Sequence, residues 1–212
     1  MIIKITYWGM ASCGKTTIIE TLHKLTTEEE KDIVPKGDLT KIAKDSGETL
    51  YYDGGYFHSR QNNLELYNIQ TVAGQKSFAP IRRSVFKKTN GVIFVVNSEI
   101  KYLEDNIEYL KELRKVSEDK LITEIPLIVM LNKKDLAETI SVDDFTQILK
   151  EEKLWYEPNN KLSIWNPIIY ETCALYDQRK NIYRSFHEII RRTTLYMTLG
   201  NGKAPRKENM AD

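Results

Sequence analysis

A loop built to hold phosphate is the first feature of this sequence that can do chemistry. Gly9, Gly14, Lys15 and Thr16 in "GMASCGKT" (9–16) have the spacing G-x-x-x-x-G-K-[ST]. The glycines let the backbone turn tightly, so that successive N–H groups point inward at phosphate oxygens. The lysine brings a positive charge to the β- and γ-phosphates, and the threonine hydroxyl is a ligand for Mg²⁺. The predicted cradle also includes Ala11, Ser12, Cys13 and Thr17.

A second polar motif predicts which base is bound. Asn132, Lys133 and Asp135 of "NKKD" follow the apolar run "LIVML" (127–131), at the sheet edge where open α/β folds bind ligands. Asp135 can accept hydrogen bonds from N1–H and the exocyclic amine of guanine. Adenine lacks this donor pair and would leave the carboxylate unpaired. Asn132 can hold N7 and the loop, and the stem of Lys133 can cover the ring.

The stretch "ETCAL" (171–175) completes the predicted base site. It follows the last apolar run, so its backbone lies at the same edge of the sheet. We expect the N–H of Ala174 to reach guanine O6, with Cys173 and Leu175 beside it. The motifs together predict a guanine nucleotide site.

Short apolar runs alternate with helical patterns between these motifs. Repeated strand–helix units predict an α/β protein with a mostly parallel six-stranded sheet, helices on both faces and one antiparallel edge strand. Apolar faces predict three helices: one with Ile18, Leu22 and Leu25, one near 99–117, and a final one from Ile182 to Thr193. The six predicted strands are 2–8, 50–53, 64–69, 92–96, 127–131 and 168–170.

The remaining segments set the expected boundaries. Residues 26–48 are predicted to form a long loop, and 54–63 a wide hairpin loop between two strands. Residues 1–200 form one expected domain. The polar tail 201–212 is expected to be disordered.

Composition narrows the class of protein. The chain has 212 residues, a net charge of +1 and 41% apolar residues, which suits a single packed domain and gives no sign of a nucleic-acid partner. Its two cysteines, Cys13 and Cys173, form neither a metal pair nor a disulfide framework, so we expect a cytoplasmic protein. No apolar run approaches the ~20 residues of a membrane span. We expect neither common lipid anchor, because Ile2 follows Met1 and the last residues include no cysteine.

The order and spacing of these motifs resemble the Ras-like small GTPases over roughly residues 1–200. Within them the chain is similar to the bacterial gliding and polarity GTPases of the MglA type, and Arf-type GTPases are neighbours. "TLYYD" (49–53) is similar to the end of that group's switch I, and "TVAGQ" (71–75), here the switch turn, resembles its "TVPGQ". The resemblance implies a P-loop NTPase fold that binds GTP or GDP with Mg²⁺. It also implies a GTP-dependent effector protein and a roadblock-type homodimeric activating protein as partners.

The resemblance also implies roles for single residues. Thr16 and Thr49 would bind Mg²⁺ directly, with Thr40 as the alternative to Thr49. The family's usual switch-turn aspartate holds a metal-bound water; here Thr71 stands in its place, and either Thr71 or Asp53 can hold that water. Gly74 leaves room for its N–H to meet the γ-phosphate.

The expected catalytic residues are Gln75, which would orient the attacking water, and Lys15. Two departures from the family bear on the rate. Glu48 stands where the MglA group carries an arginine before its switch I threonine, and Ala11 stands where glycine often makes room for an arginine finger. Such a finger contributes about 10³–10⁵ in rate, so we expect slow hydrolysis. Arg82 and Arg83 are interpreted as the solvated face of a helix.

Three hypotheses follow. The leading one is a GTPase switch whose loops are ordered by GTP. The second is a nucleotide-locked scaffold with negligible turnover, favoured by Glu48, Ala11 and Thr71. The third, an ATP-dependent kinase, is disfavoured by Asp135.

Overall fold

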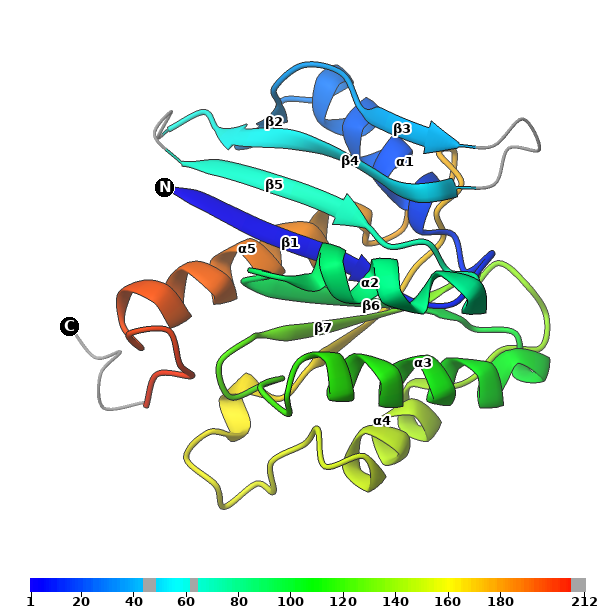
Figure 1. Cartoon of the computed structure of the whole chain (residues 1–212), viewed down its shortest axis with the longest axis vertical. Coiled ribbons are helices and arrows are strands. Elements are labelled where there is room, and N and C mark those ends of the chain that lie inside the picture. The colour runs from blue at the N-terminus through cyan, green and yellow to red at the C-terminus, as the bar shows by residue number, and fades with distance from the viewer. Residues whose placement is uncertain (44–48, 62–64, 207–212) are drawn as a thin grey trace.

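The structure is a computed structural model that describes the backbone of residues 1–43, 49–61 and 65–206, and their side chains except those of 41–53. Strands and helices alternate along most of the chain (Figure 1). The strands are β1 (Ile2–Trp8), β2 (Ile33–Pro35), β3 (Thr40–Ala43), β4 (Thr49–Ser59), β5 (Leu66–Thr71), β6 (Gly91–Asn97), β7 (Leu127–Asn132) and β8 (Ile168–Glu171). The α-helices are α1 (Lys15–Glu28), α2 (Ala79–Phe86), α3 (Leu103–Val116), α4 (Val142–Glu151) and α5 (Ile182–Thr198).

The described strands form one mixed sheet in the order β2-β4-β5-β1-β6-β7-β8, with β3 paired to β4. The strands from β5 to β8 along this order are parallel, and β2, β3 and β4 are antiparallel additions at one edge. The predicted α/β class and mostly parallel sheet are confirmed. The predicted count of six strands is wrong, because the described sheet has eight.

Both extra strands come from the segment 26–48, which was predicted to be a loop. β2 and β3 each pair with β4, which is much longer than the predicted strand 50–53. β4 continues to Ser59 and pairs with β5 from Gly54 opposite Gln70 to His58 opposite Leu66. The hairpin was therefore predicted correctly, but most of its predicted loop is strand. The long β4 offers the edge on which the two short strands pair.

Helices cover both faces of the sheet (Figure 1). α1 and α5 contact each other on one face, where Ser185 of α5 meets Met130 of β7. α3 and α4 lie on the other face, where Trp8 donates a hydrogen bond to the Tyr109 carbonyl and Phe94 stacks on Phe145. The three predicted helices are present. The expected apolar faces of α1 and α5 are buried, whereas Leu103 and Ile107 on the expected face of α3 are only partly buried. α4 was not predicted.

This topology gathers the motifs at one end of the sheet. The phosphate loop follows β1, the switch turn ends β5 and continues beyond it, "NKKD" begins at the last residue of β7, and "ETCA" begins at the last residue of β8. Because these strands are parallel, their carboxyl ends lie at the same edge. The fold therefore brings together four segments that are far apart in the sequence.

The described chain continues past the expected boundary at residue 200. The Ala204 N–H donates to the Thr123 carbonyl at 2.7 Å, and Trp165 Nε1 donates to the Pro205 carbonyl at 2.7 Å. These bonds fasten residues 204 and 205 to the domain. The rest of the tail, 207–212, lies outside the described residues.

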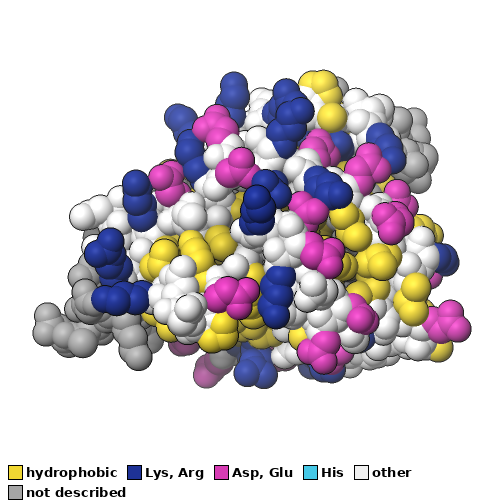
Figure 2. All heavy atoms as spheres, turned by 90° about the horizontal axis from the view of Figure 1, so that it is seen from below, with side chains coloured by type: hydrophobic (Ala, Val, Ile, Leu, Met, Phe, Trp, Pro, Cys, Tyr) yellow, Lys and Arg dark blue, Asp and Glu magenta, His cyan; other side chains and the backbone are white. Residues whose placement is uncertain are grey.

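The surface seen from the side of α4 carries basic and acidic side chains interspersed, with apolar atoms between them (Figure 2). This mixture agrees with the net charge of +1. None of the helices in the described part of the chain has the length and apolar character that a bilayer crossing requires.

Candidate guanine nucleotide site

The phosphate loop is organised around the ammonium group of Lys15, a buried residue that is only 7% exposed. Its Nζ donates to the carbonyl oxygens of Gly9 at 2.8 Å and Met10 at 2.7 Å. The third neighbour of Nζ is the sulfur of Cys13, at 3.5 Å. An ammonium has three N–H groups and sulfur is a weak acceptor, so the third N–H remains available to a phosphate oxygen. The loop thus presents a fixed positive charge.

Gly14 joins the phosphate loop to the base motif. Its φ is +99°, and a Cβ atom there would lie 2.3 Å from Nδ2 of Asn132. The same Nδ2 donates to the Cys13 carbonyl at 2.8 Å. A side chain at residue 14 would displace this amide, so glycine is required for steric as well as conformational reasons. Asn132 therefore holds the loop, as the sequence predicted.

The base motif is fixed by contacts with both neighbouring strand ends. The Thr172 hydroxyl lies 3.3 Å from the side-chain oxygen of Asn132. The Lys134 N–H donates to the Thr172 carbonyl at 3.1 Å. Lys133, with a φ of +67°, places its ammonium 3.3 Å from Glu99. The stem of Lys133 is thereby fixed beside the predicted position of the base.

Asp135 and "ETCA" lie together, as predicted. Asp135 is exposed, and its carboxylate lies near the Cys173 thiol. Burial raises the pKa of Cys173, and the nearby carboxylate raises it further, so the thiol stays protonated. The hydroxyl of Thr21 in α1 donates to the Ala174 carbonyl at 2.6 Å and fixes that peptide. Leu175 is exposed beside it.

A pocket of about 360 Å³ joins the predicted segments. It brings together the phosphate loop, the switch turn and the base motif, as the sequence predicted. Cys13 is a fully buried residue of the loop that packs in the core, and its carbonyl accepts the hydrogen bond from Asn132 Nδ2. The residues that line the pocket are Ala11, Ser12, Gly14, Lys15, Thr16, Thr17, Val72, Gly74, Gln75 and Lys133.

The switch turn packs directly on the phosphate loop. A Cβ atom on Gly74 would lie 2.3 Å from the Ala11 nitrogen and 2.5 Å from the Met10 carbonyl carbon. Only glycine permits this approach of two backbones. Gln75 follows it and lines the pocket, and Thr71 ends β5 as a buried residue opposite Tyr7.

One interpretation of the basic residues after the switch turn is wrong. Arg83 is exposed as expected, but Arg82 is only 2% exposed and is bonded to Glu112 of α3 and to carbonyls of the switch turn. Arg82 stands four residues before Phe86, so the two share the buried face of this short helix, whereas Arg83 lies outside that face. The contacts of Arg82, Glu112 and Tyr109 were not predicted.

The predicted switch I residues are described only in part. Thr49 begins β4, but its side chain and that of Asp53 lie outside the described structure, as does all of Glu48. Thr40, the alternative metal ligand, is exposed in β3 and does not line the pocket.

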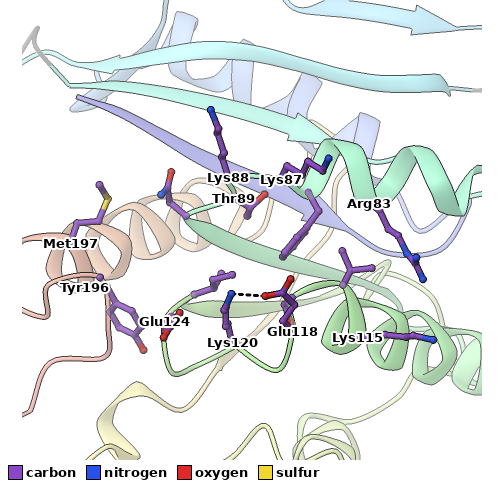
Figure 3. A pocket seen from close by; sticks show the side chains of 16 residues that line it. Arg83, Lys87, Lys88, Thr89, Lys115, Glu118, Lys120, Glu124, Tyr196 and Met197 are labelled. Carbon is purple, nitrogen blue, oxygen red and sulfur yellow. Dashed lines mark hydrogen bonds and ion pairs between the residues drawn. The ribbon is translucent and has the colours of Figure 1, made fainter.

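A larger hollow, of about 830 Å³, lies away from these motifs. Thr89, Asn90 and Ile125 line it just before β6 and β7, so it opens at the opposite end of the sheet. Figure 3 shows that Lys88 and Lys115 at its rim point away from its centre. Lys120 is paired with Glu118 at 2.6 Å. Because its charged groups do not converge, we do not place the nucleotide there.

Comparisons with known proteins identify the family to which the chain is similar. The model of the ADP-ribosylation factor family matches residues 1–191. The mutual gliding-motility protein MglA of Myxococcus xanthus is 30% identical over 158 residues, covering 71% of this chain and 77% of that protein. ADP-ribosylation factor-like protein 3 of Chlamydomonas reinhardtii is 30% identical over 149 residues, covering 69% of this chain and 71% of that protein.

A solved structure has a similar fold. It is the Arl6 BBS3 small GTPase from Trypanosoma brucei with the bound nucleotide analogue GppNp. The TM-score is 0.64 at 18% identity, and the match covers 92% of this chain and 98% of that chain. At this identity the likeness concerns the fold.

Proposed function

The chain belongs to the ADP-ribosylation factor family of Ras-like small GTPases, and from that premise we propose that it is a slow GTP-hydrolysing switch that recruits partners through its switch loops. The observation that carries the proposal is the pocket in which Lys15, Gln75 and Lys133 meet. These residues come from the phosphate loop, the switch turn and the base motif. A ligand that fills this pocket contacts all three segments at once, as a switch requires.

The site residues suit GTP or GDP. Lys15 and the backbone N–H groups of the phosphate loop would hold the phosphates. Asp135 would accept from the guanine edge, and Ala174 would donate to O6. The hydrogen bonds from Asn132 to the loop and from Thr21 to the "ETCA" peptide fix both ends of the site before the ligand enters.

The same pocket suits Mg²⁺. Thr16 lines it next to Lys15 and offers a hydroxyl oxygen, the kind of ligand that Mg²⁺ prefers. Among the described residues no group of three or more His, Cys, Asp or Glu side chains could cage a metal, so Thr16 would share the ion with water, phosphate and, by resemblance, Thr49. When bound, the ion offsets negative charge on the β- and γ-phosphates.

The described pocket favours slow hydrolysis. Gln75 lines it and can orient water, as proposed for the catalytic glutamine. Within the part of the chain that the structure describes, Lys15 and Lys133 are the cationic residues of the lining. Arg82 is committed to Glu112 and to the backbone of the switch turn. An arginine finger would therefore have to come from outside the described pocket.

We also propose that GTP-loaded protein binds an effector and that a roadblock-type homodimer accelerates hydrolysis. The exposed ring of Tyr56 on β4 supports a partner surface on this edge of the sheet. The cysteines Cys13 and Cys173 are both free thiols, which supports action in the reducing cytoplasm.

The test is nucleotide binding by the purified protein. We expect it to retain GDP or GTP, and added GTP to bind in the presence of Mg²⁺ at least about a hundredfold more tightly than ATP, because adenine would leave the Asp135 carboxylate without its hydrogen-bond donors. Lys15→Ala and Thr16→Asn should each weaken triphosphate binding. Equal affinity for GTP and ATP, or unchanged affinity in both variants, would show that the site is misplaced.

A further inference from the structure

Arg82 is buried, and each of its three guanidinium nitrogens donates at least one hydrogen bond. It lies in α2, and its neighbour Arg83 on the same helix is exposed. Arg82 Nε donates to Glu112 Oε1 at 3.0 Å, and Nη2 donates to Oε2 at 2.9 Å. This bidentate pair compensates the buried charge and fixes the plane of the guanidinium group. The third nitrogen, Nη1, is thereby aimed at the switch turn.

Three successive carbonyl groups of the switch turn accept hydrogen bonds from side chains of α2 and α3. Arg82 Nη1 donates to the Ala73 carbonyl at 3.1 Å and to the Gln75 carbonyl. The hydroxyl of Tyr109 in α3 donates to the Gly74 carbonyl between them. Burial raises the pKa of Tyr109, so the hydroxyl keeps its proton. The backbone from Ala73 to Gln75 is therefore held from behind at each residue.

These partners also reach the phosphate loop. Trp8 directly precedes Gly9, and its Nε1 donates to the Tyr109 carbonyl at 3.0 Å. The Arg82 guanidinium lies 6.0 Å from the Trp8 ring and 5.1 Å from the Tyr109 ring. On its other side the switch turn rests on the loop, where Gly74 packs against Ala11. The position of Gln75 is therefore set by α2 and α3 as well as by the loop.

We propose that Arg82, oriented by Glu112, and Tyr109 are positioning residues for GTP hydrolysis. They hold the backbone of residues 73–75 so that Gln75 meets the attacking water and the Gly74 N–H meets the γ-phosphate. The inference rests on the proposed role of Gln75. None of the three residues lines the pocket, so they act on hydrolysis through the backbone of the switch turn.

The test compares rate and affinity in Arg82→Lys and Tyr109→Phe. Lysine keeps the charge but cannot make the bidentate pair and reach the carbonyls together. Phenylalanine removes one hydroxyl and keeps the ring. Since small misplacements of a catalytic group cost up to about a hundredfold in rate, we expect single-turnover hydrolysis to fall about ten- to a hundredfold in Arg82→Lys and less in Tyr109→Phe. Affinity for GDP should stay within about twofold of the parent. Arg83→Lys is the matched control and should change neither.

A double-mutant cycle separates positioning from general destabilisation. If Arg82 acts through the switch turn, Arg82→Lys should lower hydrolysis much less in a Gln75→Leu background than in the parent, because only the contact of the Gly74 N–H is then left to lose. An unchanged rate in Arg82→Lys and Tyr109→Phe, or full additivity with Gln75→Leu, overturns the inference. If Arg82→Lys does not fold, the Tyr109→Phe cycle decides by the same criterion. A Gln75→Leu variant that hydrolyses GTP like the parent contradicts instead the proposed function on which the inference rests.

Discussion

Asp135 is the residue that carries the choice of base. Asp135→Asn should weaken GTP binding and shift preference toward xanthine nucleotides, because the O2 of xanthine accepts a hydrogen bond where guanine donates one. Competition binding with GTP and xanthosine triphosphate measures the shift. Asp143→Asn, an exposed acidic residue of α4, is the control and should keep the parent's preference. A variant that still prefers GTP would place the base elsewhere.

Gly74 tests the contact between the switch turn and the phosphate loop. In Gly74→Ala the new Cβ atom would lie 2.3 Å from the Ala11 nitrogen, so the turn or the loop must shift. We expect hydrolysis to fall by at least about tenfold, because Gln75 moves with the turn, while GDP affinity is kept. Single-turnover hydrolysis and GDP titration measure the two. Ser77→Ala, an exposed change just after the turn, should leave both unchanged; parent-like hydrolysis in Gly74→Ala would contradict the contact.

At the scale of elements, the helix that the sequence did not reveal has a strong start signal. The hydroxyl of Ser141 accepts a hydrogen bond from the Asp144 N–H at 3.0 Å, and the Asp144 carboxylate accepts one from the Ser141 N–H. The two bonds together make a capping box. Phe145, Ile148 and Leu149 then form the buried face of α4. Serine three residues before an acidic residue, followed by this apolar spacing, was sufficient to predict the helix.

Ser141→Ala should destabilise the fold by about 1 kcal/mol, the usual effect of losing an N-cap. The hydrogen bond from Ser141 lowers the pKa of Asp144. A lowered pKa in the folded state gives stability that is present at neutral pH and lost as the group protonates. The difference between variant and parent should therefore shrink below about pH 4. Denaturant unfolding of variant and parent at neutral pH and below about pH 4 measures this difference in the free energy of unfolding. The exposed change Gln147→Ala is the control. A difference that grows in acid would refute the assignment, and GTP affinity should not change.

The elements that position the site could be predicted because they are central. Strands such as 92–96 and 127–131 are almost wholly apolar and lie inside the sheet. Their composition alone therefore predicts that both of their faces are buried. The edge was harder to predict. β2 and β3 are short and pair only with β4, and Gly54 and Gly55 within β4 read as a turn.

The site, like the sheet, has parts that could be predicted from the sequence and parts that could not. The phosphate loop and base motif could be predicted because their chemistry needs fixed residue types at fixed spacing. The support of the switch turn by Arg82 could not, because it depends on α2 and α3 packing side by side. The spacing of Tyr109 and Glu112, three residues apart on α3, indicates only a shared helix face.

At the scale of the whole molecule, a switch must present different surfaces in its two nucleotide states. We expect GTP-loaded protein to capture an effector that GDP-loaded protein does not, because a switch of the proposed kind changes the conformation around Thr49 and Gly74 with the γ-phosphate. Pull-downs with the two forms, each checked for nucleotide content, measure this. Tyr56→Ser should weaken capture without changing nucleotide affinity, because the ring is exposed outside the pocket. Identical partners in both states would favour the scaffold with negligible turnover.

Single-turnover hydrolysis of GTP by the purified protein, without partners, tests the central claim most directly. With Gln75 in the pocket and no arginine finger among the described lining residues, the rate should be on the order of 10⁻⁴ to 10⁻³ per second. Gln75→Leu should lower it further and leave nucleotide affinity nearly unchanged. A rate of about 1 per second, roughly a thousand- to ten-thousandfold above that of a site without an arginine finger, would contradict this claim, as would a rate that Gln75→Leu leaves unchanged.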